Sequence, residues 1–190
     1  MGPPDGVLPG VVAMELVLAR NDRAVVFVGH VDAYPAGLAF QVRVLTGQDE
    51  WLSPSPRGIP PGLRGMRPPG QAPGGAPHYS FDEMLRFGLE FSDGRKATNV
   101  GGWTPREEGE PDGPVLLGGG GGGGRGRWDQ RFWLWPLPPP GSLSFVCEWP
   151  AADLSLSRAD VDAQLVIDAA ARARIVFKDS GPLRGPLISP

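Results

Sequence analysis

The sequence has a single cysteine and no long apolar run. Because Cys147 stands alone, the chain cannot form an intrachain disulfide or a zinc site built on several cysteines. No apolar run approaches the roughly 18 residues that a membrane helix needs, and no positively charged segment followed by an apolar stretch opens the sequence. We therefore expect a cytoplasmic protein that does not contact a membrane.

The chain also lacks an excess of positive charge and is poor in histidine. Its formal net charge is -3 and its pI is about 5.4, whereas proteins that hold nucleic acid by counterion release present a basic surface. The two histidines are His30 and His78, and with one cysteine they do not complete a tetrahedral metal site. These features predict no nucleic-acid binding, no metal and no cofactor.

Glycine and proline are present in excess, at 29 and 23 residues, a combined fraction typical of low-complexity segments. They concentrate in four places, which divide the chain. We predict flexible tails at residues 1–10 and 178–190. Between them we expect one domain, residues 11–177, that carries a low-complexity Pro/Gly-rich insertion at 47–79 and a flexible Gly-rich loop at 118–126.

Alternating apolar residues predict two β-hairpins in the first half of the domain. Residues 24–34 and 38–45 have the character of strands on either side of a Pro-Ala-Gly turn. Residues 85–91 and 95–100 form a second pair around an Asp-Gly dipeptide, which is favoured in type I′ turns. The sequence therefore predicts antiparallel neighbours at both places.

Four of the six tryptophans lie in two further strand-like runs, residues 128–135 and 143–149. In each run apolar residues alternate with a period of two. The proline-rich residues 136–140 between them cannot continue a β-ladder, because proline has no N–H group. We predict that the two runs pair as a hairpin at the centre of the fold.

The period changes after the second of these runs. Ser157 and Asp160 have the spacing of a capping box, and apolar residues then recur at helical intervals, which predicts an amphipathic helix over residues 158–175. Residues 175–177 fit a last short strand as an alternative. No strand–helix–strand alternation is present, so the sheets should be antiparallel. The predicted fold is mostly β, an antiparallel β-sandwich of about eight strands with one C-terminal α-helix.

No motif identifies an enzyme. The seven glycines from Gly118 to Gly124 precede Arg-Gly-Arg and a strand, whereas a nucleotide-binding loop ends in Gly-Lys-Ser/Thr and leads into a helix. Cys147 lies mid-strand on an apolar face, which is typical of a buried, unreactive thiol. His30 and Asp32 share a strand face, but no second ordered histidine or cysteine cluster accompanies them.

The first tryptophan-rich run carries the remaining functional signal. Tryptophans in a β protein are explained by core packing and edge cover, but one face of this run also bears charge and has the composition of a protein interface. We predict that any binding site of the ordered domain lies beside this run. The candidate binding residues are Arg125, Arg127, Arg131, Trp133 and Trp135.

These observations predict a non-enzymatic binding or protein-interaction module whose partner is another protein, with the oligomeric state left open. Two alternatives remain: a hydrolase with an unrecognised site, and a glycan-binding β-sandwich that uses the tryptophan-rich hairpin. A deep polar pocket at His30, Asp32 or Glu148 would favour the hydrolase. A flat aromatic patch would favour the binding of a partner or a glycan.

Overall fold

The computed structural model describes residues 2–47, 84–100, 111–124 and 126–177. Most of these residues lie in strands, and one segment is α-helical. The elements in chain order are β1 (Val7–Leu8), β2 (Gly10–Arg20), β3 (Ala24–Tyr34), β4 (Gly37–Thr46), β5 (Arg86–Glu90), β6 (Lys96–Thr98), β7 (Val115–Gly124), β8 (Arg127–Trp135), β9 (Ser142–Trp149), the 3-10 turn η4 (Pro150–Ala152), β10 (Leu154–Asp162), α1 (Gln164–Ala170) and β11 (Arg174–Ile175).

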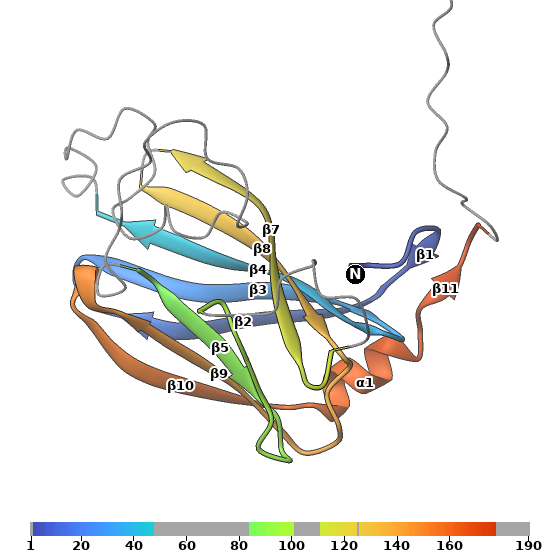
Figure 1. The fold of residues 1–190 in the computed structure, drawn as a ribbon. Coiled ribbons are helices and arrows are strands. Elements are labelled where there is room, and N and C mark those ends of the chain that lie inside the picture. The colour runs from blue at the N-terminus through green and yellow to red at the C-terminus, as the bar shows by residue number, and fades with distance from the viewer. Residues whose placement is uncertain (1, 48–83, 101–110, 125, 178–190) are drawn as a thin grey trace, which may run out of the picture.

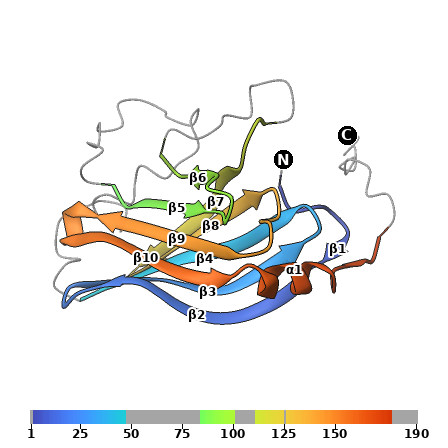
Figure 2. The same cartoon turned by 90° about the horizontal axis from the view of Figure 1, so that it is seen from below.

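The strands form two larger antiparallel sheets and one small one. A five-stranded sheet has the order β2-β3-β4-β8-β7, a four-stranded sheet has the order β10-β9-β5-β6, and β1 pairs with β11. The two larger sheets lie one over the other, and α1 covers the end nearest β1 and β11 (Figures 1 and 2). The prediction of a mostly β fold with antiparallel sheets and one C-terminal helix is confirmed.

Four phenylalanines join the two larger sheets. Phe40 and Phe132 belong to the five-stranded sheet, and Phe87 and Phe145 to the four-stranded sheet. The ring centroids of Phe87 and Phe132 are 5.4 Å apart, and those of Phe40 and Phe145 are 5.9 Å apart. All four side chains are at most 3 % exposed. Because side chains alternate across a strand, burying these rings directs the intervening residues of β4 and β8 to the outer face of the five-stranded sheet.

Both hairpins predicted in the first half are confirmed. β3 and β4 pair from Ala24–Thr46 to Tyr34–Gly37, with Pro35 and Ala36 as the turn. β5 and β6 pair around Asp93 and Gly94. That turn is not of type I′, since Gly94 alone has a positive φ, of 83°; the glycine takes the left-handed position of a longer loop.

The predicted hairpin of the two tryptophan-rich strands is wrong. β8 pairs with β4 and β7, whereas β9 pairs with β5 and β10, so the two strands lie in different sheets. The proline-rich residues 136–140 connect the sheets. A strand with one buried face has the same sequence pattern whichever strand it pairs with, so the periodicity did not identify the partner.

The glycine run is a strand, which corrects the prediction of a flexible loop at 118–126. β7 includes Gly118–Gly124 and pairs with β8, with a bulge between Gly118 and Gly121. Glycine has low strand propensity because it has no side chain to pack. Each glycine nevertheless supplies one N–H and one C=O to the ladder, and β8 offers the matching groups.

The C-terminal helix is shorter than predicted. Of residues 158–175, the first five belong to β10, and α1 is confined to Gln164–Ala170. The hydroxyl of Ser157 donates a hydrogen bond to the carbonyl oxygen of Cys147 on β9 and does not cap a helix. In this segment the apolar side chains also alternate with a period of two, and pairing with β9 selects that alternative.

The ends of the domain also differ from the prediction. Val7 of β1 pairs with Ile175 of β11, within the segment 1–10 that was expected to be a tail. Apart from Gly47, the predicted insertion 47–79 lies outside the described residues, and so does the predicted tail 178–190. No helix in the described part of the chain has the length and apolar character needed to cross a membrane.

Candidate functional site

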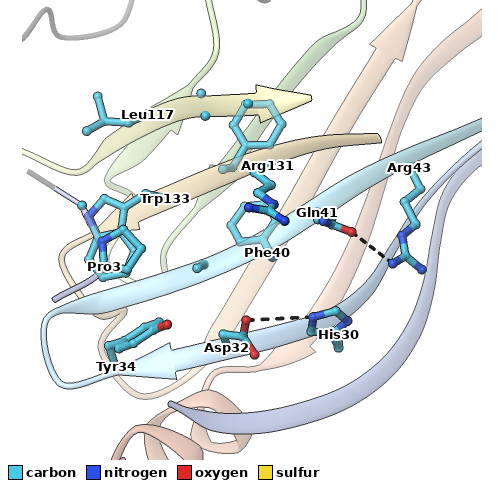
Figure 3. Close-up of a pocket in the computed structure, with 16 residues that line it drawn as sticks. Pro3, His30, Asp32, Tyr34, Phe40, Gln41, Arg43, Leu117, Arg131 and Trp133 are labelled. Carbon is cyan, nitrogen blue, oxygen red and sulfur yellow. Dashed lines mark hydrogen bonds and ion pairs between the residues drawn. The ribbon is translucent and has the colours of Figure 1, made fainter. Parts of the chain in front are cut away.

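A groove of about 810 Å³ runs across the outer face of the five-stranded sheet. Its floor comes from β3, β4, β8 and the start of the glycine run in β7, and Gly2 and Pro3 also line it (Figure 3). The polar side chains that line it are His30, Asp32, Tyr34, Gln41, Arg43 and Arg131. These residues lie opposite the phenylalanine core because they alternate with buried residues along each strand.

Strand register explains why this face is hollow. Trp133 on β8 pairs with Ala39 on β4, and Ala39 pairs in turn with Asp32 on β3. The small alanine therefore separates a large ring from a carboxylate. On the other side of β8, a Cβ built on Gly119 would lie 3.4 Å from the Cβ of Arg131. Small residues on both flanks of β8 leave the Arg131 and Trp133 side chains bordering open space.

The cations of this face differ in how they are neutralised. Arg43 forms an ion pair with Asp129, with 3.3 Å between Nε and Oδ1, and it donates a 3.0 Å hydrogen bond to the side-chain oxygen of Gln41. Arg127 lies 3.4 Å from the same aspartate. Among the described residues, the guanidinium of Arg131 makes neither an ion pair nor a hydrogen bond, and the residue is exposed. Arg131 is therefore the cation of the groove that is available to a ligand.

An aromatic pair forms one wall of the groove. The rings of Tyr34 and Trp133 meet edge to face, with centroids 5.6 Å apart and an interplanar angle of 65°. Partial burial, and secondarily the charge of Asp32, raise the pKa of the Tyr34 hydroxyl, which keeps it protonated and able to donate. Trp133 is 4 % exposed, and its buried Nε1 has no hydrogen-bond partner among the described residues. A buried N–H donor without an acceptor is uncommon in folded proteins.

His30 and Asp32 face each other on β3, with 4.0 Å between Nε2 and Oδ2. This distance is too long for a hydrogen bond. Both side chains are partly exposed, at 48 % and 32 %. Within the described ranges, no three side chains of histidine, cysteine, aspartate or glutamate gather closely enough to hold a metal ion.

Cys147 lies in the core and away from the groove. The residue is 0 % exposed, and burial, with a smaller contribution from the charge of Glu148, raises the pKa of its thiol to about 12. A thiol in this state is a poor nucleophile, because the thiolate is the reactive form. The burial expected from the sequence is confirmed.

The structure separates the five candidate residues chosen from the sequence. Arg131 and Trp133 line the groove. Arg127 is exposed on β8 and paired with Asp129 outside the groove, and Trp135 is half-buried and also outside it. Arg125 lies outside the described residues. The four described candidates share one face of β8, as the alternation predicted, and Trp133 is buried, which the sequence had left open.

The residues of β3 and β4 that complete the groove were not selected from the sequence as binding residues. His30 and Asp32 were considered as a possible metal site and as possible members of a hydrolase pocket, and Gln41 and Arg43 were not singled out. The pairing of β4 with β8, which sets Gln41 opposite Arg131, joins residues 90 positions apart in the chain. The spacing of residues in the sequence carries no signal for that contact.

Comparison of the chain with models of protein families, with curated proteins and with solved structures found no match.

Proposed function

We propose that this protein is a non-enzymatic binding module that recognises a partner protein in the groove on the outer face of the five-stranded sheet. In this proposal Arg131 binds a carboxylate of the partner. The observation that carries the proposal is the guanidinium of Arg131 on the groove floor, which has no ion-pair partner among the described residues and lies beside two arginines that pair with Asp129.

Electrostatics favour an acidic group at this point. Asp129 forms ion pairs with both Arg43 and Arg127 and offsets one of their two positive charges, whereas no described acidic residue forms an ion pair with Arg131. A planar guanidinium can bind a carboxylate through two parallel hydrogen bonds. Hydrogen bonds to charged groups stabilise by about 1.5–3 kcal/mol. Asp32, across the groove, repels a second anion, so that the ligand is oriented with its acidic group toward β8.

The dimensions of the groove are compatible with a specific ligand. Its volume of about 810 Å³ falls within the range of about 300–1,000 Å³ that ligand sites occupy. Tyr34 and Trp133 provide an apolar wall, and Gln41 adds an amide next to Arg131. A few convergent polar groups on an apolar surface are typical of sites that select their ligand by orientation.

A hydrolase remains the second candidate, because the groove contains His30 and Asp32. A polar pocket at these residues is the feature that would favour a hydrolase. The 4.0 Å separation does not hold the imidazole in one orientation. Among the described residues that line the groove there is no serine, threonine or cysteine. Hydrolysis of a panel of nitrophenyl esters that His30→Ala abolishes would favour this function over binding.

The glycan alternative has less support. Sugar-binding tryptophans offer an open ring face, but Trp133 is 4 % exposed, with Tyr34 against one side. The indole also lies over Gly37, where a built Cβ would come within 2.9 Å of its Cζ2. This side chain therefore serves as a wall and does not form a flat platform.

The proposal is tested with the smallest probe that carries the recognised group, the end-blocked amino acid N-acetyl-glutamate methylamide. Its neutral counterpart with glutamine is the matched control. We expect the acidic probe, and not the neutral one, to shift the indole N–H resonance of Trp133 in a saturable way. Arg131→Gln should remove this response, whereas Arg20→Gln, which changes an exposed arginine outside the groove, should preserve it. Equal responses to both probes, or an unaltered response in Arg131→Gln, would contradict the proposal.

A further inference from the structure

The glycine run lies on the edge strand of the five-stranded sheet, as far as the described residues show. β7 is the last strand in the order β2-β3-β4-β8-β7. Its residues Gly118–Gly123 are exposed. Apart from the ladder with β8 and a hydrogen bond from the Gln130 amide to the Gly119 carbonyl, no hydrogen bond joins this run to another described residue. Along its outer side the edge therefore presents backbone donors and acceptors that another strand can pair with.

The fold requires glycine at only some of these positions. A Cβ built on Gly121 would lie 2.5 Å from the carbonyl oxygen of Asp129, and one on Gly123 would lie 2.6 Å from the Cα of Trp128. At Gly120 and Gly122 a built Cβ meets no atom within 4 Å. Glycine in a strand costs about 0.5–1 kcal/mol relative to alanine. Packing against the described residues does not account for that cost at Gly120 and Gly122, whereas the close approach of another backbone would.

This edge also lacks the usual protection against pairing. Exposed edge strands commonly carry lysine, proline or inward-pointing charges that prevent another strand from adding. The segment Gly118–Gly124 contains none of these, and its one irregularity is the bulge, after which the ladder resumes at Gly121. The bulge can itself disfavour pairing, but it ends at Gly121, and the regular edge beyond it favours the addition of a strand.

The charge next to β7 indicates what the added strand carries. Arg131 lies beside Gly119, which has no side chain to separate the guanidinium from the edge. An added strand would lie about 10 Å from β8, two strand spacings away. Extended arginine and glutamate side chains together span that distance. The positive charge of Arg131 favours an acidic side chain on the added strand.

We propose that the edge of β7 accepts an extended acidic segment of a partner protein as a sixth strand of the sheet. The backbone of the segment pairs with the glycine run, and an acidic side chain on the groove face binds Arg131. This inference rests on the proposed function and names its partner class. Strand addition derives affinity from main-chain hydrogen bonds and specificity from alternate side chains.

The test uses a synthetic, end-blocked peptide of about nine residues in which glutamate and valine alternate, a length matched to an ordinary strand. Three further peptides have the same side chains but carry backbone N-methyl groups. The first is methylated along one edge of the extended backbone, the second along the other edge, and the third along both edges. We expect the unmodified peptide to bind and to slow amide hydrogen exchange in Gly118–Gly124. The doubly methylated peptide should bind at least about tenfold more weakly, because its backbone cannot donate to β7.

Protein variants separate this inference from the proposed function. Arg131→Gln should weaken the unmodified peptide about tenfold, whereas Arg20→Gln should not, and a peptide with lysine in place of glutamate should not bind. If the single glutamate probe binds at Arg131 but N-methylation has no effect on the peptide, strand addition is wrong and the groove proposal stands. If neither probe binds, both proposals are wrong. Slow exchange in the glycine run of the protein alone, together with a dimeric mass by sedimentation, would show a second copy at this edge and overturn the inference.

Discussion

Gly123 of β7 and Trp128 of β8 are so close that a Cβ built on the glycine would lie 2.6 Å from the Cα of the tryptophan. The two residues are register partners. The neighbouring Gly122 faces the other way, with no atom within 4 Å of its built Cβ. Packing against β8 therefore requires glycine at position 123 but not at position 122.

The first prediction compares these two positions. Gly123→Ala should lower the free energy of unfolding by about 1–3 kcal/mol, because the backbone of β8 must move to admit the methyl group. Gly122→Ala should leave it unchanged or raise it by up to about 1 kcal/mol, since alanine restricts the unfolded chain. Urea denaturation of the two variants measures the difference. Equal stabilities would show that the glycine run does not pair with β8 in this register.

The second prediction concerns Asn21, in the turn between β2 and β3. Its side-chain oxygen accepts hydrogen bonds from the backbone N–H groups of Arg23 and Ala24, each at 2.9 Å, and its amide donates to the carbonyl of Ala152 at 2.8 Å. The Asn21 side chain thus links the β2–β3 hairpin to the segment between β9 and β10. Asn21→Ala should lower the free energy of unfolding by about 1–3 kcal/mol, because it removes these hydrogen bonds. Asp22→Ala, an exposed neighbour in the same turn, should change stability by less than about 0.5 kcal/mol.

Thermal or urea unfolding would test this pair of variants. The turn assignment is contradicted if Asn21→Ala unfolds at the same denaturant concentration as the unaltered protein.

The third prediction follows from the raised pKa of Cys147. The unfolded thiol loses its proton near its ordinary pKa of 9.0, whereas the folded thiol keeps it up to about 12. Between these values the unfolded state binds fewer protons, so rising pH favours unfolding. The contribution of this group should fall by about 1.4 kcal/mol per pH unit in that window, with no effect below it.

The measurement is the free energy of unfolding against pH for the protein and for Cys147→Ala. Cys147→Ala should lower the free energy of unfolding at every pH, because it removes packed volume. Only the unaltered protein should also lose stability through the thiol as the pH rises above 9.0. Parallel curves would mean that the thiol is not buried. Independently, labelling of Cys147 by a thiol reagent at pH 8 should proceed no faster than the protein unfolds.

The fourth prediction concerns the segment 47–79, whose sequence offers few apolar side chains to a core. Replacing it with a Gly-Ser linker of about half its length should preserve cooperative melting, because halving a loop changes its closure entropy by only about 0.6 kcal/mol. Calorimetry of the shortened protein provides the measurement. A broad or absent transition would assign the segment to the core.

The local sequence pattern was sufficient to predict strand pairing where the paired strands are also consecutive in the chain. The β3–β4 hairpin was predicted because Pro35 and Ala36 separate two strand-like runs, and the short connection leaves each run only the other to pair with. The β8–β9 pairing was wrong because a longer connection allows a change of sheet. The helix prediction was too long because residues 158–162 satisfy both periods, and only contact with β9 decides between them.

The candidate binding residues also divide into those that the local sequence identified and those that only the strand pairing revealed. Arg131 and Trp133 were identified because arginine and tryptophan on one strand face are typical of interfaces. Their neighbours Ala39 and Gln41 have no unusual composition. They matter because β4 pairs with β8 in a register that sets them beside those two side chains.

The sequence by itself determined the fold class, the buried faces of most strands and the burial of Cys147, since alternating hydrophobicity and turn residues act over a few positions. The tertiary structure decided that seven glycines form an edge strand, that the tryptophan-rich strands belong to different sheets, and that Arg131 has no acidic partner in the described part of the chain. Each of these depends on hydrogen bonds or charges contributed by distant segments. Such contacts arise only when the sheets assemble, because backbone pairing is available to every residue and does not depend on its side chain.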